Sequence, residues 1–108
     1  MDIRGLQERA MALRTQYAAL EVERHGRSWT REEVALGFVG DVGDLMKLVM
    51  AKEGVRAIPD TDEKLAHELA DCLWVLLVLA QLYEVDIEQV FLHTMDDLET
   101  RIATRTAM

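Results

Sequence analysis

The sequence is poor in the residues that make turns, cross-links and basic surfaces. One proline and six glycines among 108 residues leave little material for turns, so we expect a few long elements. The single cysteine, Cys72, excludes an internal disulfide and fits a reducing cytoplasm, and its apolar neighbours favour a buried, inert thiol. A net charge of -8 argues against a nucleic-acid polymer as partner, because such polymers normally bind a basic face.

Long hydrophobic segments are also missing. The longest unbroken apolar run, Cys72 to Ala80, is much shorter than the roughly 20 residues needed to span a bilayer. The first residues contain no apolar region of the kind found in signal peptides. Half of the residues are hydrophobic and 30% are charged, the balance of a soluble globular protein. We therefore expect a cytoplasmic protein with no membrane partner, formed by a single all-α domain over residues 1–108.

Helix signals recur along the chain at regular intervals. They predict four helices, over about residues 3–24, 31–53, 61–83 and 86–104. Thr30 and Glu33 form a capping box, Asp60 is expected to cap the third helix with its side chain, and Gly26 and Gly54 suit helix C-termini. No segment alternates with the period of a half-buried strand. The prediction is an all-α, four-helix bundle-like fold with antiparallel neighbours.

The third predicted helix is apolar nearly all round between Leu69 and Leu82. One interpretation is a central helix that three others contact. The other is that part of this surface forms a subunit interface, since it is too large to leave exposed to water. We favour the second interpretation and expect a homo-oligomer.

Two pairs of acids are spaced three residues apart: Asp41 with Asp44, and Glu68 with Asp71. Residues at this spacing share one face of a helix, and an antiparallel hairpin would bring the two pairs to similar depths. Closely placed carboxylates need a compensating cation, and Mg²⁺ prefers oxygen ligands. Because the chain has 20 acids, such pairs also arise by chance on solvated surfaces. Spacing and apolar neighbours alone leave these two interpretations balanced.

Three glycines, Gly37, Gly40 and Gly43, follow one stripe beside the first acid pair. Each costs about 1 kcal/mol relative to alanine inside a helix, so the stripe needs a reason. A close helix crossing and room for a ligand are both compatible with it. A ferritin-like di-iron site is excluded, because no glutamate lies three residues before a histidine.

The second acid pair lies in a longer pattern, Lys64-Leu-Ala-His-Glu-Leu-Ala-Asp-Cys-Leu-Trp74, and the first lies in Gly40-Asp-Val-Gly-Asp-Leu45. These segments resemble the K-x-x-x-E-L-x-D-x-L-W and E-x-G-E-L motifs of the MazG-like, all-α nucleoside triphosphate pyrophosphohydrolases. The resemblance covers about residues 29–101. The second motif is close to typical, whereas Asp41 and Asp44 stand where the family has glutamate.

The resemblance implies a helical bundle that forms a dimer or a dimer of dimers. It implies hydrolysis of (deoxy)nucleoside triphosphates to a monophosphate and pyrophosphate, in a nucleotide-pool cleaning role. Mg²⁺, or Mn²⁺, would be held by Asp41, Asp44, Glu68 and Asp71, with Glu68 as the residue that orients the attacking water. The shorter side chains at the first pair leave two alternatives open: a catalytically weak or silent module that binds a nucleotide or a protein partner, and a relative that acts on phosphoribosyl-ATP.

Three further residues are candidates for substrate binding, each with an ordinary structural alternative. Trp29 is suited to stacking on a nucleobase, and equally to packing onto the following helix. Lys47 is suited to phosphate, although a simple ion pair with Asp44 is the more common role at this spacing. Arg101 is suited to phosphate from the last helix, although a solvated charge is more common there.

Overall fold

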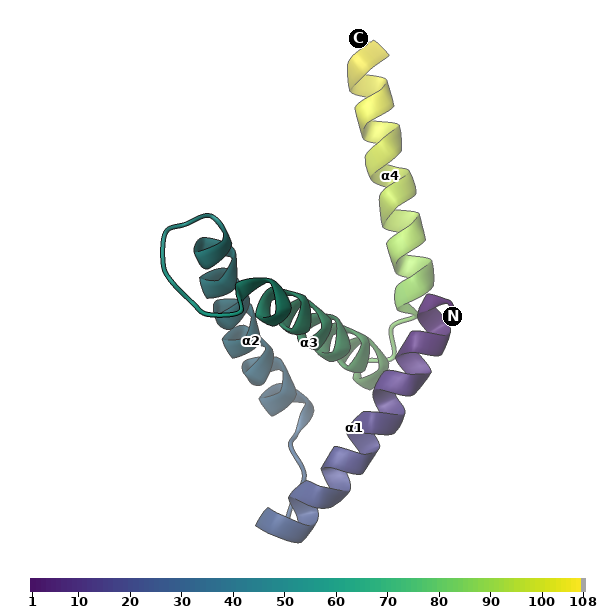
Figure 1. Ribbon diagram of the computed structural model, residues 1–108. Coiled ribbons are helices and arrows are strands. Elements are labelled where there is room, and N and C mark those ends of the chain that lie inside the picture. Colours follow the sequence, from purple (N-terminus) through teal and green to yellow (C-terminus); the bar gives the residue numbers. More distant parts are fainter. Residues whose placement is uncertain (108) are drawn as a thin grey trace.

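Four α-helices make up the protein in a computed structural model that describes residues 1–107 (Figure 1). They are α1 (Ile3–His25), α2 (Arg31–Lys52), α3 (Thr61–Leu82) and α4 (Ile87–Ala107). The described residues contain no β-strand. The predicted all-α class is therefore confirmed, and the predicted helix bounds are correct to within about three residues.

The ends of the first two helices follow the predicted capping chemistry. The Thr30 hydroxyl accepts from the Glu33 backbone N–H at 3.1 Å, and the Glu33 carboxylate accepts from the Thr30 N–H at 3.1 Å. Gly26 ends α1 with a positive φ of 80°, which glycine adopts without steric cost. A hydrogen bond from Arg27 lowers the pKa of Glu33 to about 2, helped by the Thr30 backbone N–H, so this cap remains ionised in mild acid.

The predicted side-chain cap at the start of α3 is wrong. Asp60 has a left-handed backbone with φ of 55°, and its side chain makes no capping hydrogen bond. A side-chain cap requires an extended backbone at this position, which a left-handed residue does not have. Instead, the Thr61 hydroxyl donates to the Ile58 carbonyl at 2.6 Å and holds the loop to the first turn of the helix.

The core lies where α1, α2 and α3 meet. Loop 53–60 joins α2 and α3 into a helical hairpin, and α1 packs on α3 from the other side (Figure 1). Trp74 of α3 connects the two parts, because its indole Nε1 donates to the Ala10 carbonyl at 3.1 Å and its ring lies 5.6 Å from that of Tyr17. The buried members of this core are small or branched: Ala10, Val34, Leu77 and Val78.

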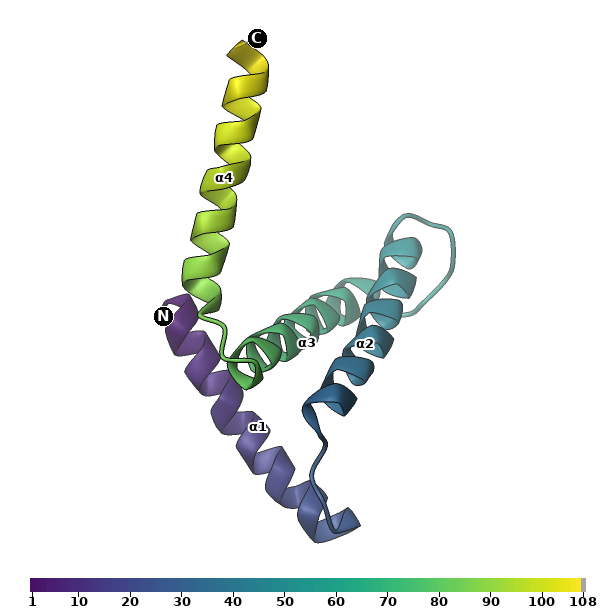
Figure 2. The ribbon, with the colours of Figure 1, turned by 180° about the vertical axis from the view of Figure 1, so that it is seen from behind.

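Helix α4 does not fold back onto the other helices as a bundle would require. It meets α1 near the chain start, where Arg4 and Asp86 form a 2.9 Å ion pair, and then extends away from α2 and α3 (Figures 1 and 2). The radius of gyration is 17.5 Å, against about 13 Å for a compact domain of about 100 residues. A single copy is therefore an open assembly and not a closed four-helix bundle.

One described helix, α3, is long and apolar enough to cross a membrane by length and composition alone. Only 22% of the residues in its apolar window are buried. Core helices of soluble proteins also meet this criterion. Because α3 carries Glu68 and Asp71 and is packed between α1 and α2, it serves here as the central helix of the fold.

Replacing Thr30 by alanine tests the capping box. The Thr30→Ala variant loses the hydroxyl that accepts from the Glu33 N–H, so the free energy of unfolding should fall by about 1 kcal/mol. Urea denaturation at one fixed protein concentration measures this. Thr15→Ala is the control, because Thr15 is an exposed position inside α1 whose hydroxyl bonds only to the Met11 carbonyl. Equal stability of the two variants would contradict the prediction.

Candidate metal centre and adjoining pocket

Three carboxylates of the α2–α3 hairpin lie close together. Asp41 and Asp44 of α2 and Glu68 of α3 each offer an oxygen, and these oxygens all lie within 4.8 Å of one another. Asp41 and Glu68 are half-buried, whereas Asp44 is exposed. The two aspartates share a face of α2 because they are three residues apart, and the hairpin places Glu68 opposite them.

The fourth predicted ligand, Asp71, is not part of this group. Its Oδ2 lies 3.2 Å from Nε2 of His67, four residues earlier on α3. It is nevertheless close enough to Asp41 and Glu68 for its charge to raise the pKa of both. The structure therefore brings three predicted residues into one cluster and places Asp71 beside it.

Electrostatics set this cluster apart from the other acids. Desolvation raises the pKa of Asp41, and the charges of Asp71 and Asp44 raise it further. Desolvation also raises the pKa of Glu68, with added repulsion from Asp71, Asp41 and Asp44. Nζ of Lys47 lies 3.9 Å from Asp44 Oδ1, an exposed pair that contributes little. Lys47 thus makes the ion pair expected of it.

The donor set fits a hard divalent cation. All three groups supply carboxylate oxygen, which Mg²⁺ and Mn²⁺ prefer, and a cation would remove the repulsion that raises their pKa values. Aspartate is one methylene shorter than the glutamate of the related motif. Even so, oxygens of Asp41, Asp44 and Glu68 lie within 4.8 Å of one another, close enough for small side-chain movements to bring them onto one ion.

The glycine stripe does not mark a helix crossing in a single copy. Nothing lies within 4 Å of an added Cβ at Gly40 or Gly43. At Gly37, an added Cβ would lie 3.1 Å from the Trp29 ring, so this glycine gives the indole room to lie against α2. The stripe therefore provides open space beside the acids and a contact surface for one aromatic ring.

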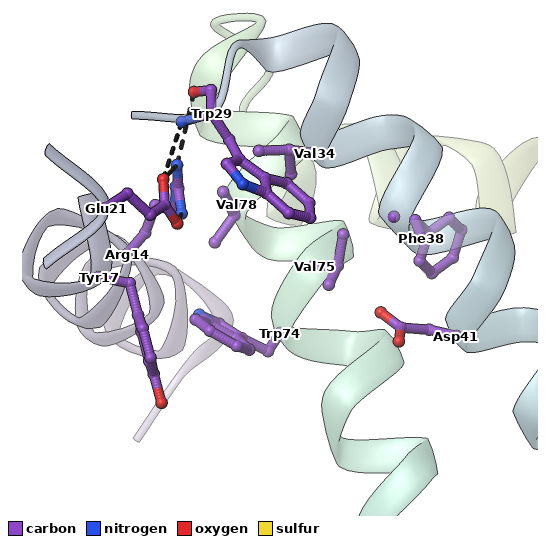
Figure 3. Close-up of a pocket in the computed structure, with 11 residues that line it drawn as sticks. Arg14, Tyr17, Glu21, Trp29, Val34, Phe38, Asp41, Trp74, Val75 and Val78 are labelled. Carbon is purple, nitrogen blue, oxygen red and sulfur yellow. Dashed lines mark hydrogen bonds and ion pairs between the residues drawn. The ribbon is translucent and has the colours of Figure 1, made fainter. Parts of the chain in front are cut away.

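A pocket of about 400 Å³ opens between α1, α2 and α3 and reaches Asp41 (Figure 3). Its walls are mainly aromatic and aliphatic, and an Arg14–Glu21 ion pair closes one side. Figure 3 shows Trp29 and Asp41 at separate parts of this pocket, with Trp74 and Val75 between α1 and α2. The residues lining it are Arg14, Tyr17, Glu21, Trp29, Val34, Gly37, Phe38, Asp41, Trp74, Val75 and Val78.

Sequence reasoning found Trp29 but missed what α1 contributes. Tyr17 follows the apolar face of its helix and reads as core, and Arg14 and Glu21 read as solvated charges seven residues apart. The one available signal is that seven residues are two helical turns, so the two charges share a face with Tyr17. That they enclose a pocket depends on how α1 crosses α3.

A second hollow, of about 390 Å³, adjoins Asp44 and Glu68 and is lined mainly by charged and titratable side chains. Its charged and titratable lining residues are Asp44, Glu63 and Glu68 together with Lys47, Lys64 and His67. Lys64 was missed as a candidate. It lies one helical turn before Glu68, a spacing that puts both on one face of α3.

Arg101 is not brought to the acids. It is exposed on the C-terminal half of α4, which extends away from the α2–α3 hairpin (Figure 1). The hypothesis that it contacts phosphate beside the acids therefore has no support within one copy.

Fold and site together define an all-α protein whose helical hairpin carries clustered carboxylates between an aromatic pocket and a hollow lined by both acids and lysines. The chain matches the family model of the MazG nucleotide pyrophosphohydrolase domain over residues 43–106, more than half of its length, and it belongs to that family. The match begins inside the first acid motif, at Gly43. Comparisons with curated proteins and with solved structures gave no match.

The raised pKa values predict how stability depends on pH and on a cation. A carboxyl whose pKa is higher in the folded state binds more protons there than in the unfolded state, so stability falls as pH rises through that range. For metal-free protein, Asp41 and Glu68 should therefore lower the melting temperature as the pH rises from their ordinary pKa values, 3.8 and 4.5, through their raised ones. Mg²⁺ should raise the melting temperature at pH 7.5, and at 100 times its Kd it should add about 2.7 kcal/mol to the free energy of unfolding. The effect of Mg²⁺ should be smaller in acid, where protons compete for the carboxylates.

Neutral variants separate this effect from other acids. Asp41→Asn and Glu68→Gln should flatten the pH dependence and remove most of the Mg²⁺ effect in thermal melts. Asp96→Asn, at an exposed position of α4, should change neither. A wild-type melting temperature that does not respond to Mg²⁺ or Mn²⁺ at pH 7.5 would contradict the assignment of a metal centre.

Proposed function

We propose that the chain is a metal-dependent pyrophosphohydrolase that converts (deoxy)nucleoside triphosphates to monophosphate and pyrophosphate. The observation that carries this proposal is the cluster of Asp41, Asp44 and Glu68, whose oxygens lie within 4.8 Å of one another. The cluster lies between a pocket that suits a planar base and a hollow that suits phosphate. Membership of the MazG pyrophosphohydrolase family supports the same reaction.

The metal ligands in this proposal are Asp41, Asp44 and Glu68, with Asp71 as a neighbour that adds negative charge. Mg²⁺ is the proposed ion and Mn²⁺ the alternative, because the donors are carboxylate oxygens. When bound, such an ion neutralises phosphate charge and lowers the pKa of a coordinated water. Nε2 of His67 lies 3.2 Å from Oδ2 of Asp71 beside the cluster, a contact that becomes an ion pair when the imidazole is protonated.

The two hollows beside the acids determine how the substrate would be oriented in this proposal. The aromatic pocket beyond Asp41 would take the base, with Trp29 as a stacking surface. The hollow beside Asp44 would take the β- and γ-phosphates, since Lys47 and Lys64 both line it. The bond between the α- and β-phosphates would then lie at the carboxylates, which agrees with release of pyrophosphate.

Glu68 is the residue proposed to accept a proton from the attacking water. Desolvation raises its pKa, which makes it a better base than an exposed carboxylate. It also comes from α3, opposite the two aspartates of α2, so it can face the phosphate chain from the other helix. The proposed role is nucleotide-pool cleaning in the cytoplasm, with no nucleic-acid polymer and no membrane as partner.

The functional unit in this proposal is a homo-oligomer. The chain exposes 8244 Å², against about 6,000 Å² for a compact monomer of this mass, and obligate interfaces bury more than about 2,000 Å². On α4, Phe91, Met95, Leu98 and Ile102 follow the 4–3–4 spacing of a heptad seam. Three of these side chains are exposed in a single copy, namely Phe91, Leu98 and Ile102. On α3, Leu69, Leu73 and Leu76 are also exposed.

The activity is tested with a panel of canonical and modified dNTPs, NTPs and phosphoribosyl-ATP in the presence of Mg²⁺. Pyrophosphate should appear with at least one nucleoside triphosphate, and Glu68→Gln should reduce kcat by at least about 100-fold, the usual contribution of a general base. Glu23→Gln is the matched control, because Glu23 is an exposed glutamate of α1. Quantification of pyrophosphate and of nucleoside monophosphate checks the cleavage position.

The same panel distinguishes the alternatives. Turnover of phosphoribosyl-ATP alone would identify the histidine-pathway relative. Mg²⁺-dependent binding of a non-hydrolysable triphosphate without any turnover would identify a silent binding module, as the shorter side chains of Asp41 and Asp44 allow. If no substrate of the panel is bound and none releases pyrophosphate, the proposal is rejected.

The oligomer is tested by sedimentation equilibrium. Wild-type protein should have the mass of a dimer or a tetramer, and Leu98→Lys should shift the mass toward the monomer because a charge then lies in the apolar seam. Thr100→Lys is the control, since residue 100 is two positions further along and lies on another face of α4. A wild-type monomer, or an unchanged oligomer in Leu98→Lys, would contradict this part of the proposal.

A further inference from the structure

Trp29 forms a wall of the aromatic pocket, although it belongs to the linker between α1 and α2. The residue is 49% exposed, and its ring lies 3.1 Å from where a Cβ would stand at Gly37 of α2. A residue in a linker is not held by helical hydrogen bonds on both sides. The position of this ring therefore depends on other contacts.

Two charged side chains of α1 hold the backbone of Trp29. Glu21 Oε1 accepts from the Trp29 N–H at 2.8 Å, and Arg14 Nη2 donates to the Trp29 carbonyl at 3.5 Å. Arg14 also donates to both oxygens of Glu21, at 2.7 and 2.9 Å. The two side chains are only 13% and 18% exposed. One ion pair thus binds both the backbone N–H and the backbone carbonyl of Trp29 (Figure 3).

A pair of this kind calls for a reason other than stability. Two charges removed from water lose hydration energy, and well-packed apolar residues often replace such pairs without loss of stability. Both partners also lie on the same helix, so their contact with each other joins no separate elements. What the pair adds is its contact with Trp29, which fixes the linker on the pocket.

We propose that Arg14 and Glu21 are positioning residues that hold Trp29 as the stacking wall for the nucleobase, with Gly37 providing room for the ring. The inference rests on the proposed function, because it takes the pocket as the base subsite of a nucleotide. Neither residue belongs to the acid cluster or lines the hollow proposed for the phosphates, so both act through Trp29. Arg14 also lowers the pKa of Glu21 through its hydrogen bonds, which keeps the carboxylate ionised as an acceptor.

Loss of the stacking contact should change KM and leave kcat unchanged. A base stacks on Trp29 equally in the bound substrate and in the transition state, so losing this contact weakens binding without slowing the chemical step. Glu21→Ala, which removes both the ion pair and the acceptor for the Trp29 N–H, should raise KM about tenfold, the lower part of the range for one base–aromatic stack, and leave kcat unchanged. Glu21→Gln keeps an acceptor oxygen and should show a smaller increase.

Two controls separate positioning from a general loss of structure. Glu23→Gln, two residues along α1, should leave KM unchanged. A triphosphate ester of deoxyribose without a base should give the same kinetic constants with wild type and Glu21→Ala, because it cannot stack. Parallel losses of kcat, or equal losses with the base-free substrate, would show a merely structural role and overturn the proposal.

A readout that needs no turnover keeps this test independent of the proposed activity. In ¹H–¹⁵N spectra the two indole signals belong to Trp29 and Trp74. Glu21→Ala should move the Trp29 signal and leave that of Trp74 in place. It should also increase about tenfold the concentration of nucleoside monophosphate that is needed to shift the Trp29 signal. If no triphosphate is hydrolysed but these changes appear, the activity is rejected and the positioning role stands. An unmoved Trp29 signal with unchanged affinity rejects the positioning role.

A second variant covers the case in which Glu21→Ala does not fold. In Gly37→Ala the new Cβ would lie 3.1 Å from the ring, so the indole must shift by a few tenths of an ångström. Alanine favours the helix over glycine by about 1 kcal/mol, so α2 itself is not weakened. A KM increase of about threefold with unchanged kcat is expected, within the range of partial loss of a stack. Unchanged KM together with an unmoved Trp29 signal would overturn the proposal.

Discussion

Repulsion among carboxylates on the α2–α3 hairpin is the constraint on which the rest of this structure depends. Asp41, Asp44 and Glu68 lie within 4.8 Å of one another beside the apolar half of α3, and the pKa values of Asp41 and Glu68 are raised by desolvation and by neighbouring charge. Such a group is costly in the folded state unless protons or a cation neutralise it. The hairpin therefore holds these acids in place at an energetic cost, which the core formed with α1 offsets.

Local chemistry allowed much of the fold to be predicted from the sequence. Helix periodicity, the Thr30–Glu33 capping box and the glycines at two helix ends depend on residues within a turn or two, and the structure contains all of them. The prediction failed at Asp60, where the loop before α3 imposes a left-handed backbone that the side chain cannot override. It also failed to place α4, because the position of a helix that packs weakly on its own chain is not set by local signals.

The candidate site could be predicted to the same extent and for the same reason. Spacing within a helix put Asp41 beside Asp44, and a helical hairpin suffices to bring Glu68 to them. It did not reveal that Asp71 would lie outside the group, since that depends on the angle between α2 and α3. For the pocket, the sequence predicted only that Trp29 is suited to stacking on a nucleobase. The pocket wall from α1 depends on a crossing between segments more than fifty residues apart, for which the sequence carries no local signal.

The position of the pocket has a consequence for how this chain can change. The acids lie at residues 41–71, whereas Arg14, Tyr17, Glu21 and Trp29 all precede the segment that matches the family model, which starts at residue 43. One wall of the pocket, from α1 and the linker, is thus encoded outside the stretch that carries the acids. Substitutions in α1 and its linker can reshape the selectivity of the pocket while the carboxylates stay where they are, so recognition and chemistry can evolve independently.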